Sequence, residues 1–197
     1  MAESSEASAG LRALWRGLPR EHRRWIVLNA LLVTAAINVV VNALIAWVTI
    51  RGESNVPLWS VPLVEKPSTI TDTVGTFFVL PLITCLLATT AVWRERRIGR
   101  LPSLGGGLPL HILLSNVPRT RFWRGVRLGA VVTIALTPIS VLILAAIDFG
   151  GITQGQFVLY KAALGVALGA VVTPLIALWA MADPLPTLVS GTGKRSP

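Results

Sequence analysis

The chain has 197 residues and a formal net charge of +9; hydrophobic residues make up 53% of it and charged residues only 14%. Soluble domains carry about 25% charged residues, so this composition excludes an ordinary soluble globular protein. Cys85 is the single cysteine. Neither an internal disulfide nor a cysteine-based metal site can therefore form within one chain.

The first 25 residues form a basic and amphipathic segment. Its apolar residues Leu11, Leu14, Trp15 and Leu18 recur at helical spacing among arginines, which predicts a short helix on the membrane surface that ends at Pro19. We expect anionic lipid as its partner, because basic residues near a charged membrane surface are each worth about 1 kcal/mol.

Four long apolar segments follow, and none of them contains Asp, Glu, Lys or Arg. They are residues 26–50, 73–93, 128–147 and 162–182. At about 1.5 Å per residue, each reaches roughly across the 30 Å hydrocarbon core of a bilayer. We therefore predict an all-α integral membrane protein with a four-helix transmembrane domain over 26–182. Its helices are expected at about 26–50, 69–93, 126–147 and 157–182.

Basic residues gather on one side of this predicted topology. They crowd the segment before the first helix and the loop 94–125, whereas the segment between the first two helices has only Arg51 and Lys66. The positive-inside rule then places both termini, the loop and a flexible tail 183–197 in the cytoplasm. Topology explains the basicity, so we expect no nucleic-acid partner. The arginines expected to contact anionic lipid are Arg20, Arg23, Arg24, Arg94, Arg96, Arg97, Arg121 and Arg124.

Each predicted helix has one face of small or polar residues at 100° per residue. In chain order, these faces hold Thr34, Asn38, Asn42 and Thr49; Thr69, Asp72, Thr73, Thr76 and Thr84; Gly129, Thr133, Thr137 and Ser140; and Lys161, Ala162, Gly165, Gly169 and Thr173. Asn29 falls opposite Asn38. The GxxxG spacing of Gly165 and Gly169 predicts close helix packing. Because such faces suit lipid poorly, we expect the four of them to meet in a bundle with a polar seam.

Candidate site residues lie on that seam. They are Asn38, Asn42, Asp72, Thr76, Thr84, Thr137 and Lys161. We expect Lys161 to pair with Asp72 or with Asp148, either as a lock between helix ends or as the charged mouth of a ligand pocket. The seam itself is either a set of hydrogen bonds between helices or a polar pocket that opens outward.

Two further features leave alternatives open. The stretch "VLPLITCL" at 79–86 resembles "VTPLIALW" at 172–179, which indicates either a parallel repeat of two helical hairpins or chance similarity of short apolar strings. The loop 94–125 is longer than the topology needs. It is expected to pack at the interface, dock a partner protein or act as a gate.

The function is predicted only broadly. A non-catalytic membrane subunit or scaffold is the first hypothesis; the alternative is a small oligomeric permease or transporter that binds a modest polar solute from the outer side. We expect no enzyme activity, cofactor or metal: no catalytic constellation is found, and His22 and His111 are isolated and expected at the surface or interface. A second copy of the chain or another membrane protein is an expected partner. Arginine outnumbers lysine 15 to 3, which favours a bacterial inner membrane.

Overall fold

The computed structural model describes residues 15–60, 68–102, 104, 118, 120–147 and 151–183. Leu11, Leu14, His111, most of the expected loop between 103 and 119, and the tail after 183 lie outside the described residues. Within the described part, four helices are long and apolar enough to cross a membrane by length and composition. They are Arg20–Thr49, Thr69–Arg97, Arg121–Ala146 and Gln154–Ala182.

The first long helix contains a widened stretch. It starts as α2 (Arg20–Trp25), continues as a π-helix, η1 (Ile26–Val33), and ends as α3 (Thr34–Thr49). Pro19 precedes it, where the absence of a proline N–H is tolerated. The Thr34 hydroxyl donates to the carbonyl of Asn29 at 2.9 Å, a reach of five residues that matches the wider π turn.

The other long helices are α4 (Thr69–Arg97), α6 (Arg121–Ile147) and α7 (Gln154–Ala182). Ser68 caps α4 by accepting a hydrogen bond from the backbone N–H of Thr71 at 3.3 Å. Thr153 starts α7 with a capping box, in which Gln156 bonds back to the Thr153 N–H. A proline lies inside each of the three helices, Pro81, Pro138 and Pro174.

A short antiparallel ribbon joins the two helical hairpins at one end of the molecule, the ribbon end. Strand β1 (Asn55–Val56) pairs with β2 (Ile152–Thr153), with Asn55 opposite Thr153 and Val56 opposite Ile152. Val56 is buried together with Phe157, Ala46 and Ile50. The loop after α3 is thereby anchored to the start of α7.

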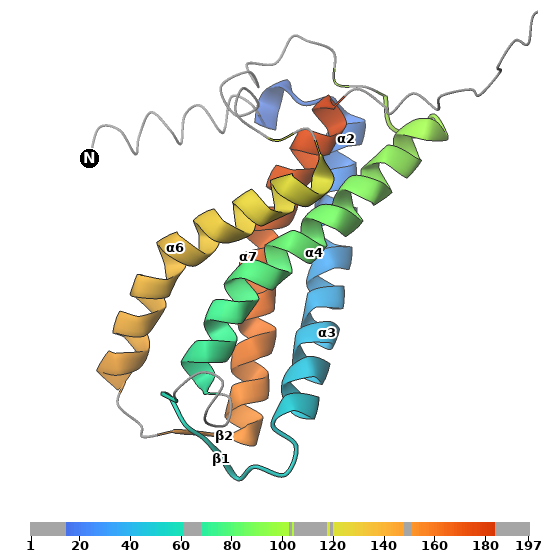
Figure 1. The fold of residues 1–197 in the computed structure, drawn as a ribbon. Helices are drawn as coiled ribbons and strands as arrows, with labels where there is room; N and C mark the ends of the chain where they lie inside the picture. The colour runs from blue at the N-terminus through green and yellow to red at the C-terminus, as the bar shows by residue number, and fades with distance from the viewer. Residues whose placement is uncertain are drawn as a thin grey trace, which may run out of the picture.

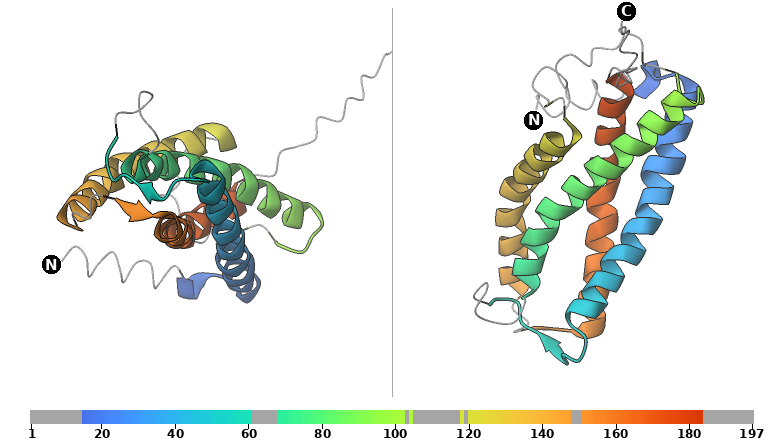
Figure 2. Two further views of the ribbon diagram at one scale, coloured as in Figure 1. Left: turned by 90° about the horizontal axis from the view of Figure 1, so that it is seen from below. Right: turned by 45° about the vertical axis from the view of Figure 1, so that its right-hand side comes forward.

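The long helices pack in a row, so the single polar seam expected within the bundle does not form (Figures 1 and 2). α4 packs against α6 on one side and α7 on the other, and α3 packs against α7. In the part of the chain that the structure describes, α6 is not packed extensively against α3 or α7, nor α3 against α4. The four small faces therefore do not meet at one seam. The order α6, α4, α7, α3 leaves α6 at one edge and separates α3 from α4.

The end opposite the ribbon, the arginine end, has its own apolar core. Leu18, Ile26, Val92, Leu101 and Met181 are buried there together. Leu18 was expected on the membrane surface, but it packs into this core instead. The expectation of a surface or interfacial His22 is also wrong: His22 is fully buried. The imidazole Nε2 lies 2.9 Å from the carbonyl oxygen of Pro102, which gives the ring a polar partner.

Candidate functional site

A groove runs between α3 and α4, and we call it the α3–α4 groove. It contains two cavities of about 320 and 280 Å³. Both cavities are lined by Asn38, Val41, Ile83 and Thr84, so they are parts of one feature. The first extends to Asp72 and Lys161 at the ribbon end, and the second to Trp25 and Glu95 at the arginine end. Since α7 packs against both α3 and α4, it forms the floor of the groove.

Asparagines of α3 lie directly over glycines of α7. The Asn38 Nδ2 donates to the carbonyl of Gly165 at 3.3 Å, and the Asn42 Nδ2 donates to the carbonyl of Asn38 at 2.9 Å. A Cβ on Gly165 would lie 2.5 Å from the Asn42 Nδ2, and one on Gly169 would lie 2.2 Å from the Asn38 Nδ2. The two amides therefore occupy space that only glycine leaves free. The α3–α7 contact depends on both pairs.

The ribbon end of the groove holds a buried ion pair. Lys161 of α7 is only 2% exposed, and its Nζ contacts the carboxylate of Asp72 and donates to the hydroxyl of Thr76, both on α4. One residue earlier, the Tyr160 hydroxyl lies 2.8 Å from that of Thr73. Of the two predicted partners of Lys161, Asp72 is the one observed; Asp148 lies outside the described residues. The pair joins α7 to α4 next to the first cavity.

Two threonine hydroxyls in the groove lack protein partners within the described chain. Thr173 is 1% exposed, and its Oγ1 has no hydrogen-bond partner there. Thr84 is 7% exposed and lines both cavities, and its hydroxyl likewise makes no hydrogen bond to the described residues. Other threonines within the helices, such as Thr76 and Thr133, donate to the carbonyl four residues earlier. The difference leaves two unused donors at the centre of the groove.

Asn29 also lines the groove, although a regular helix would place it opposite Asn38. The π-helix between them accounts for this difference, because its wider turn advances each residue through a smaller angle. Trp25 and Glu95 likewise line the second cavity without having been predicted.

Thr137 does not join the other seam candidates. It lies on α6, whose extensive packing within the described chain is against α4, and it does not line either groove cavity. The small face of α6 is used elsewhere: a Cβ on Gly125 would lie 2.8 Å from the Leu82 side chain, and one on Gly129 would lie 2.7 Å from the Phe78 carbonyl oxygen. These glycines bring α6 close to α4, so Thr137 is kept from the α3–α4 groove.

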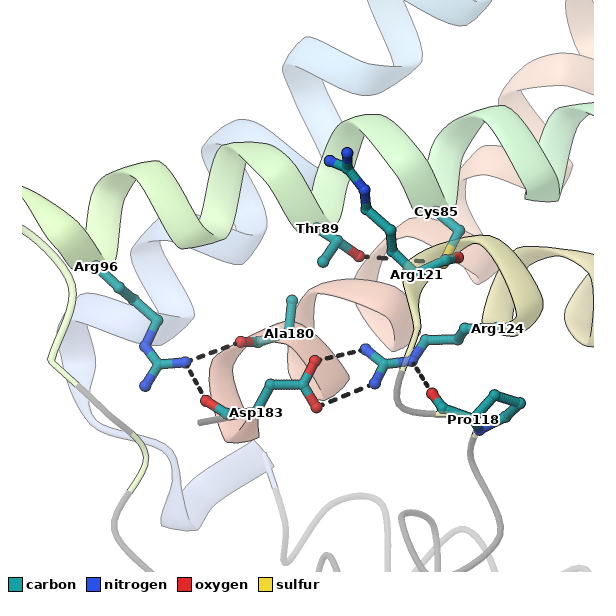
Figure 3. Close-up of polar contacts among 8 residues, drawn as sticks. All are labelled: Cys85, Thr89, Arg96, Pro118, Arg121, Arg124, Ala180 and Asp183. Carbon is teal, nitrogen blue, oxygen red and sulfur yellow. Dashed lines mark hydrogen bonds and ion pairs between the residues drawn. The ribbon is translucent and has the colours of Figure 1, made fainter. Parts of the chain in front are cut away.

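At the arginine end, Asp183 connects three helices (Figure 3). Its carboxylate accepts two hydrogen bonds from Arg124 of α6, at 2.7 and 3.0 Å. Arg96 of α4 donates to the Asp183 carbonyl and, at 3.1 Å, to that of Ala180. Arg124 was expected to contact lipid, but its side chain is only 3% exposed because the bidentate pair withdraws it from the surface. The sequence offered a signal for this site: an acidic residue directly after the last helix, at the end where arginines gather.

The remaining arginines expected at lipid are more exposed. Arg20, Arg24, Arg94, Arg97 and Arg121 are exposed, while Arg23 and Arg96 are half-buried. Arg121 also donates to the hydroxyl of Thr90 at 2.6 Å, and its carbonyl accepts the Cys85 thiol at 3.4 Å. These contacts hold the start of α6 against α4.

The described residues provide no cluster of three or more His, Cys, Asp or Glu that could hold a metal ion. The groove offers apolar walls, the amides of Asn38 and Asn42, the hydroxyls of Thr84 and Thr173 and the ion pair of Asp72 with Lys161. No protein-family model, curated protein or solved structure matches this chain.

Proposed function

We propose that this chain is a non-catalytic, multi-pass membrane protein, a subunit or scaffold, whose α3–α4 groove receives a transmembrane helix of another membrane protein. The observation that carries the proposal is a long groove with exposed aliphatic walls and the hydroxyls of Thr84 and Thr173 at its centre, of which the Thr173 Oγ1 has no hydrogen-bond partner among the described residues.

The length of the groove suits a helix that crosses a bilayer. Along α4 its lining extends from Asp72 to Glu95. At about 1.5 Å per residue this stretch is roughly 35 Å long, close to the 30 Å of a hydrocarbon core. Its walls carry exposed aliphatic side chains, among them Val41, Ile45 and Ile83. Such walls can pack against one face of a helix without any change in the row of four.

The hydroxyls argue against an acyl chain as the occupant. An unpaired polar group in an apolar medium costs roughly 2 to 7 kcal/mol, and hydrocarbon cannot supply a hydrogen bond. A helix that presents Ser, Thr or Asn at the level of Thr84 can supply one to that hydroxyl, as polar residues do between helices in membranes. We therefore expect the partner helix to carry a small polar residue near its middle.

The proposal also covers the orientation of the chain in the membrane and the membrane in which it lies. Arginines of α2, α4 and α6 gather at the arginine end, which supports a cytoplasmic position for that end and for both termini. We place the chain in a bacterial inner membrane on its arginine-rich composition. A parallel repeat is supported by the packing: the first helix of each hairpin, α3 or α6, packs against the second helix of the other, α7 or α4.

The proposal is tested with a photo-crosslinking residue at Ile83, in the groove, and at Ile134 of α6 as the matched control outside it. In the native membrane we expect Ile83 to give an adduct whose peptide maps to a transmembrane segment with a central Ser, Thr or Asn. Thr84→Val with Thr173→Val should reduce this adduct severalfold, while the control position should give no such peptide.

Three results would overturn the proposal. These are an Ile83 adduct with lipid alone, an adduct that Thr84→Val with Thr173→Val leaves unchanged, and a peptide from a second copy of the same chain. The last result would replace the partner protein by a homo-oligomer.

A second function, binding of a modest polar solute, is favoured by one observation. The cavity of about 320 Å³ is lined by Asn38, Asn42, Asp72 and Lys161 together, and its volume lies at the lower end of the range for small-molecule sites. If this function holds, Asn42→Ala should abolish solute binding or flux while the Ile83 adduct persists. If Asn42→Ala abolishes the Ile83 adduct but leaves solute binding and flux unchanged, the solute-binding function is rejected.

A further inference from the structure

A second hollow lies on the outer side of the first long helix at the arginine end. It measures about 590 Å³ and is lined by Trp15, Arg20, Arg23, Arg24, Val27 and Leu28. We call it the arginine hollow. None of these residues lines the α3–α4 groove, so the two features are separate. We propose that the arginine hollow binds one anionic phospholipid, with its phosphate on the three arginines and an acyl chain on Val27 and Leu28.

The spacing of the helix brings these groups together. Arg20, Arg23 and Arg24 are followed by Val27 and Leu28, each three or four residues further along the chain, so all five lie on one helix face. The arginines occupy the level just before the long apolar stretch, and the two aliphatic residues lie at its beginning. This is the order in which a phospholipid presents its phosphate and its acyl chains.

The charge of the hollow is unmatched among the described residues. None of the three arginine side chains forms an ion pair or hydrogen bond there, whereas the side chains of Arg124 and Arg96 at the same end are held by Asp183 and by backbone carbonyls. A guanidinium binds a phosphate through two parallel N–H donors, and three of them around one hollow favour an anionic headgroup over a zwitterionic one.

The apolar side of the hollow favours a lipid over a free anion. Val27 and Leu28 are 39% and 42% exposed, and Trp15 is 38% exposed beside them. Aliphatic side chains gain by covering a hydrocarbon chain, and an indole suits the interfacial depth. A soluble phosphate would make no contact with these apolar surfaces. The inference rests on the membrane location proposed above, but it does not require a partner helix in the α3–α4 groove.

The test uses the full-length chain, purified and stripped of lipid in detergent, and measured by native mass spectrometry. The probes are phosphatidylglycerol and phosphatidylcholine with the same acyl chains, and glycerol phosphate as the headgroup alone. We expect one phosphatidylglycerol to be retained over phosphatidylcholine by about tenfold or more, given the attraction per arginine near a membrane surface. Glycerol phosphate should not displace it at equal concentration.

Matched variants separate the hollow from general basicity. Arg20→Gln, Arg23→Gln and Arg24→Gln together should bring the ratio of the two lipids close to one. Arg94→Gln, Arg97→Gln and Arg100→Gln remove the same charge from exposed arginines outside the hollow and should leave the ratio unchanged. Leu28→Asn should weaken retention of both lipids.

Substitution of the same three arginines by lysine keeps the charge, so it tests whether a loss of selectivity in the glutamine variant comes only from a failure to fold. Arg20→Lys, Arg23→Lys and Arg24→Lys together should retain most of the selectivity, and added salt should lower it in the unmodified chain. Equal retention of the two lipids, equal loss in the control variant, or displacement by glycerol phosphate would each overturn the proposal. The Ile83 adduct should be the same in all these variants. The test of lipid binding in the arginine hollow can therefore fail or succeed independently of the test of a partner helix in the α3–α4 groove.

Discussion

The helices α6 and α7 differ sharply in burial although their sequences are alike. Both are apolar, and both contain two glycines four residues apart. Yet 56% of the most apolar stretch of α7 is buried, against 6% in α6. α7 packs extensively against α4 on one side and α3 on the other, whereas among the described helices α6 packs extensively only against α4. A glycine pair therefore indicates that a helix packs closely, but not how many neighbours it has.

The largest effect is expected at Lys161 of α7. Lys161→Met leaves the carboxylate of Asp72 next to an apolar side chain, and loss of one partner of a buried ion pair costs about 3 to 5 kcal/mol. We expect a correspondingly large fall in the unfolding temperature in detergent. Adding Asp72→Leu should restore most of the stability, since no unpaired charge then remains. A double variant no more stable than Lys161→Met would show that the pair is not the source of the effect.

The next effect compares the two glycine pairs directly. Gly169→Val forces Asn38 away and should loosen α3 from α7, while Gly129→Val meets the Phe78 carbonyl and should loosen α6 from α4. Overpacking typically costs about 1 to 3 kcal/mol. The buried thiol of Cys85, at the α4–α6 contact, provides the readout: a maleimide should label it faster in Gly129→Val but not in Gly169→Val.

Gly75→Ala is the control for both glycine variants, because nothing lies within 4 Å of a Cβ there. Its Cys85 labelling should match that of the unmodified chain, and its stability should be equal or slightly higher, because alanine favours a helix more than glycine does. Equal labelling of Cys85 in Gly129→Val and Gly169→Val would contradict the assignment of the two glycine pairs to different contacts.

The smallest effect is expected in a comparison of the hydrogen-bonded face of α3 with the exposed face of α6. Asn38→Ala with Asn42→Ala removes two hydrogen bonds on α3, each worth about 0.6 kcal/mol in membrane proteins, so we expect a loss of roughly 1 kcal/mol. Val131→Ala with Ile134→Ala on the exposed face of α6 should change stability by less than about 0.5 kcal/mol. A thermal unfolding series would measure both. A larger loss in the α6 variant would indicate that this face is covered.

Hydropathy was sufficient to predict four long apolar helices, and the helical spacing placed Asn38, Asn42, Gly165 and Gly169 on faces that do meet. The same spacing could not predict which helices are neighbours, because each apolar helix has many equivalent ways to pack. Thr137 was therefore assigned to a seam that α6 does not reach. The pairing of Arg124 with Asp183 was missed for a related reason, since it depends on where two helix ends meet.

The π-helix at Ile26–Val33 separates the two candidate binding features along a single helix. The arginine hollow lies at and before its start, and most of the α3 wall of the groove lies after it. Deletion of one residue there, such as Leu32, would turn the wide segment into regular helix. Because each α-helical residue turns further than a π-helical one, the deletion is partly offset, and everything before the segment would rotate by roughly 45°. Neither feature would lose a lining residue. The chain length of this one segment thus sets the angle between the lipid that we propose at the surface and the helix that we propose in the groove.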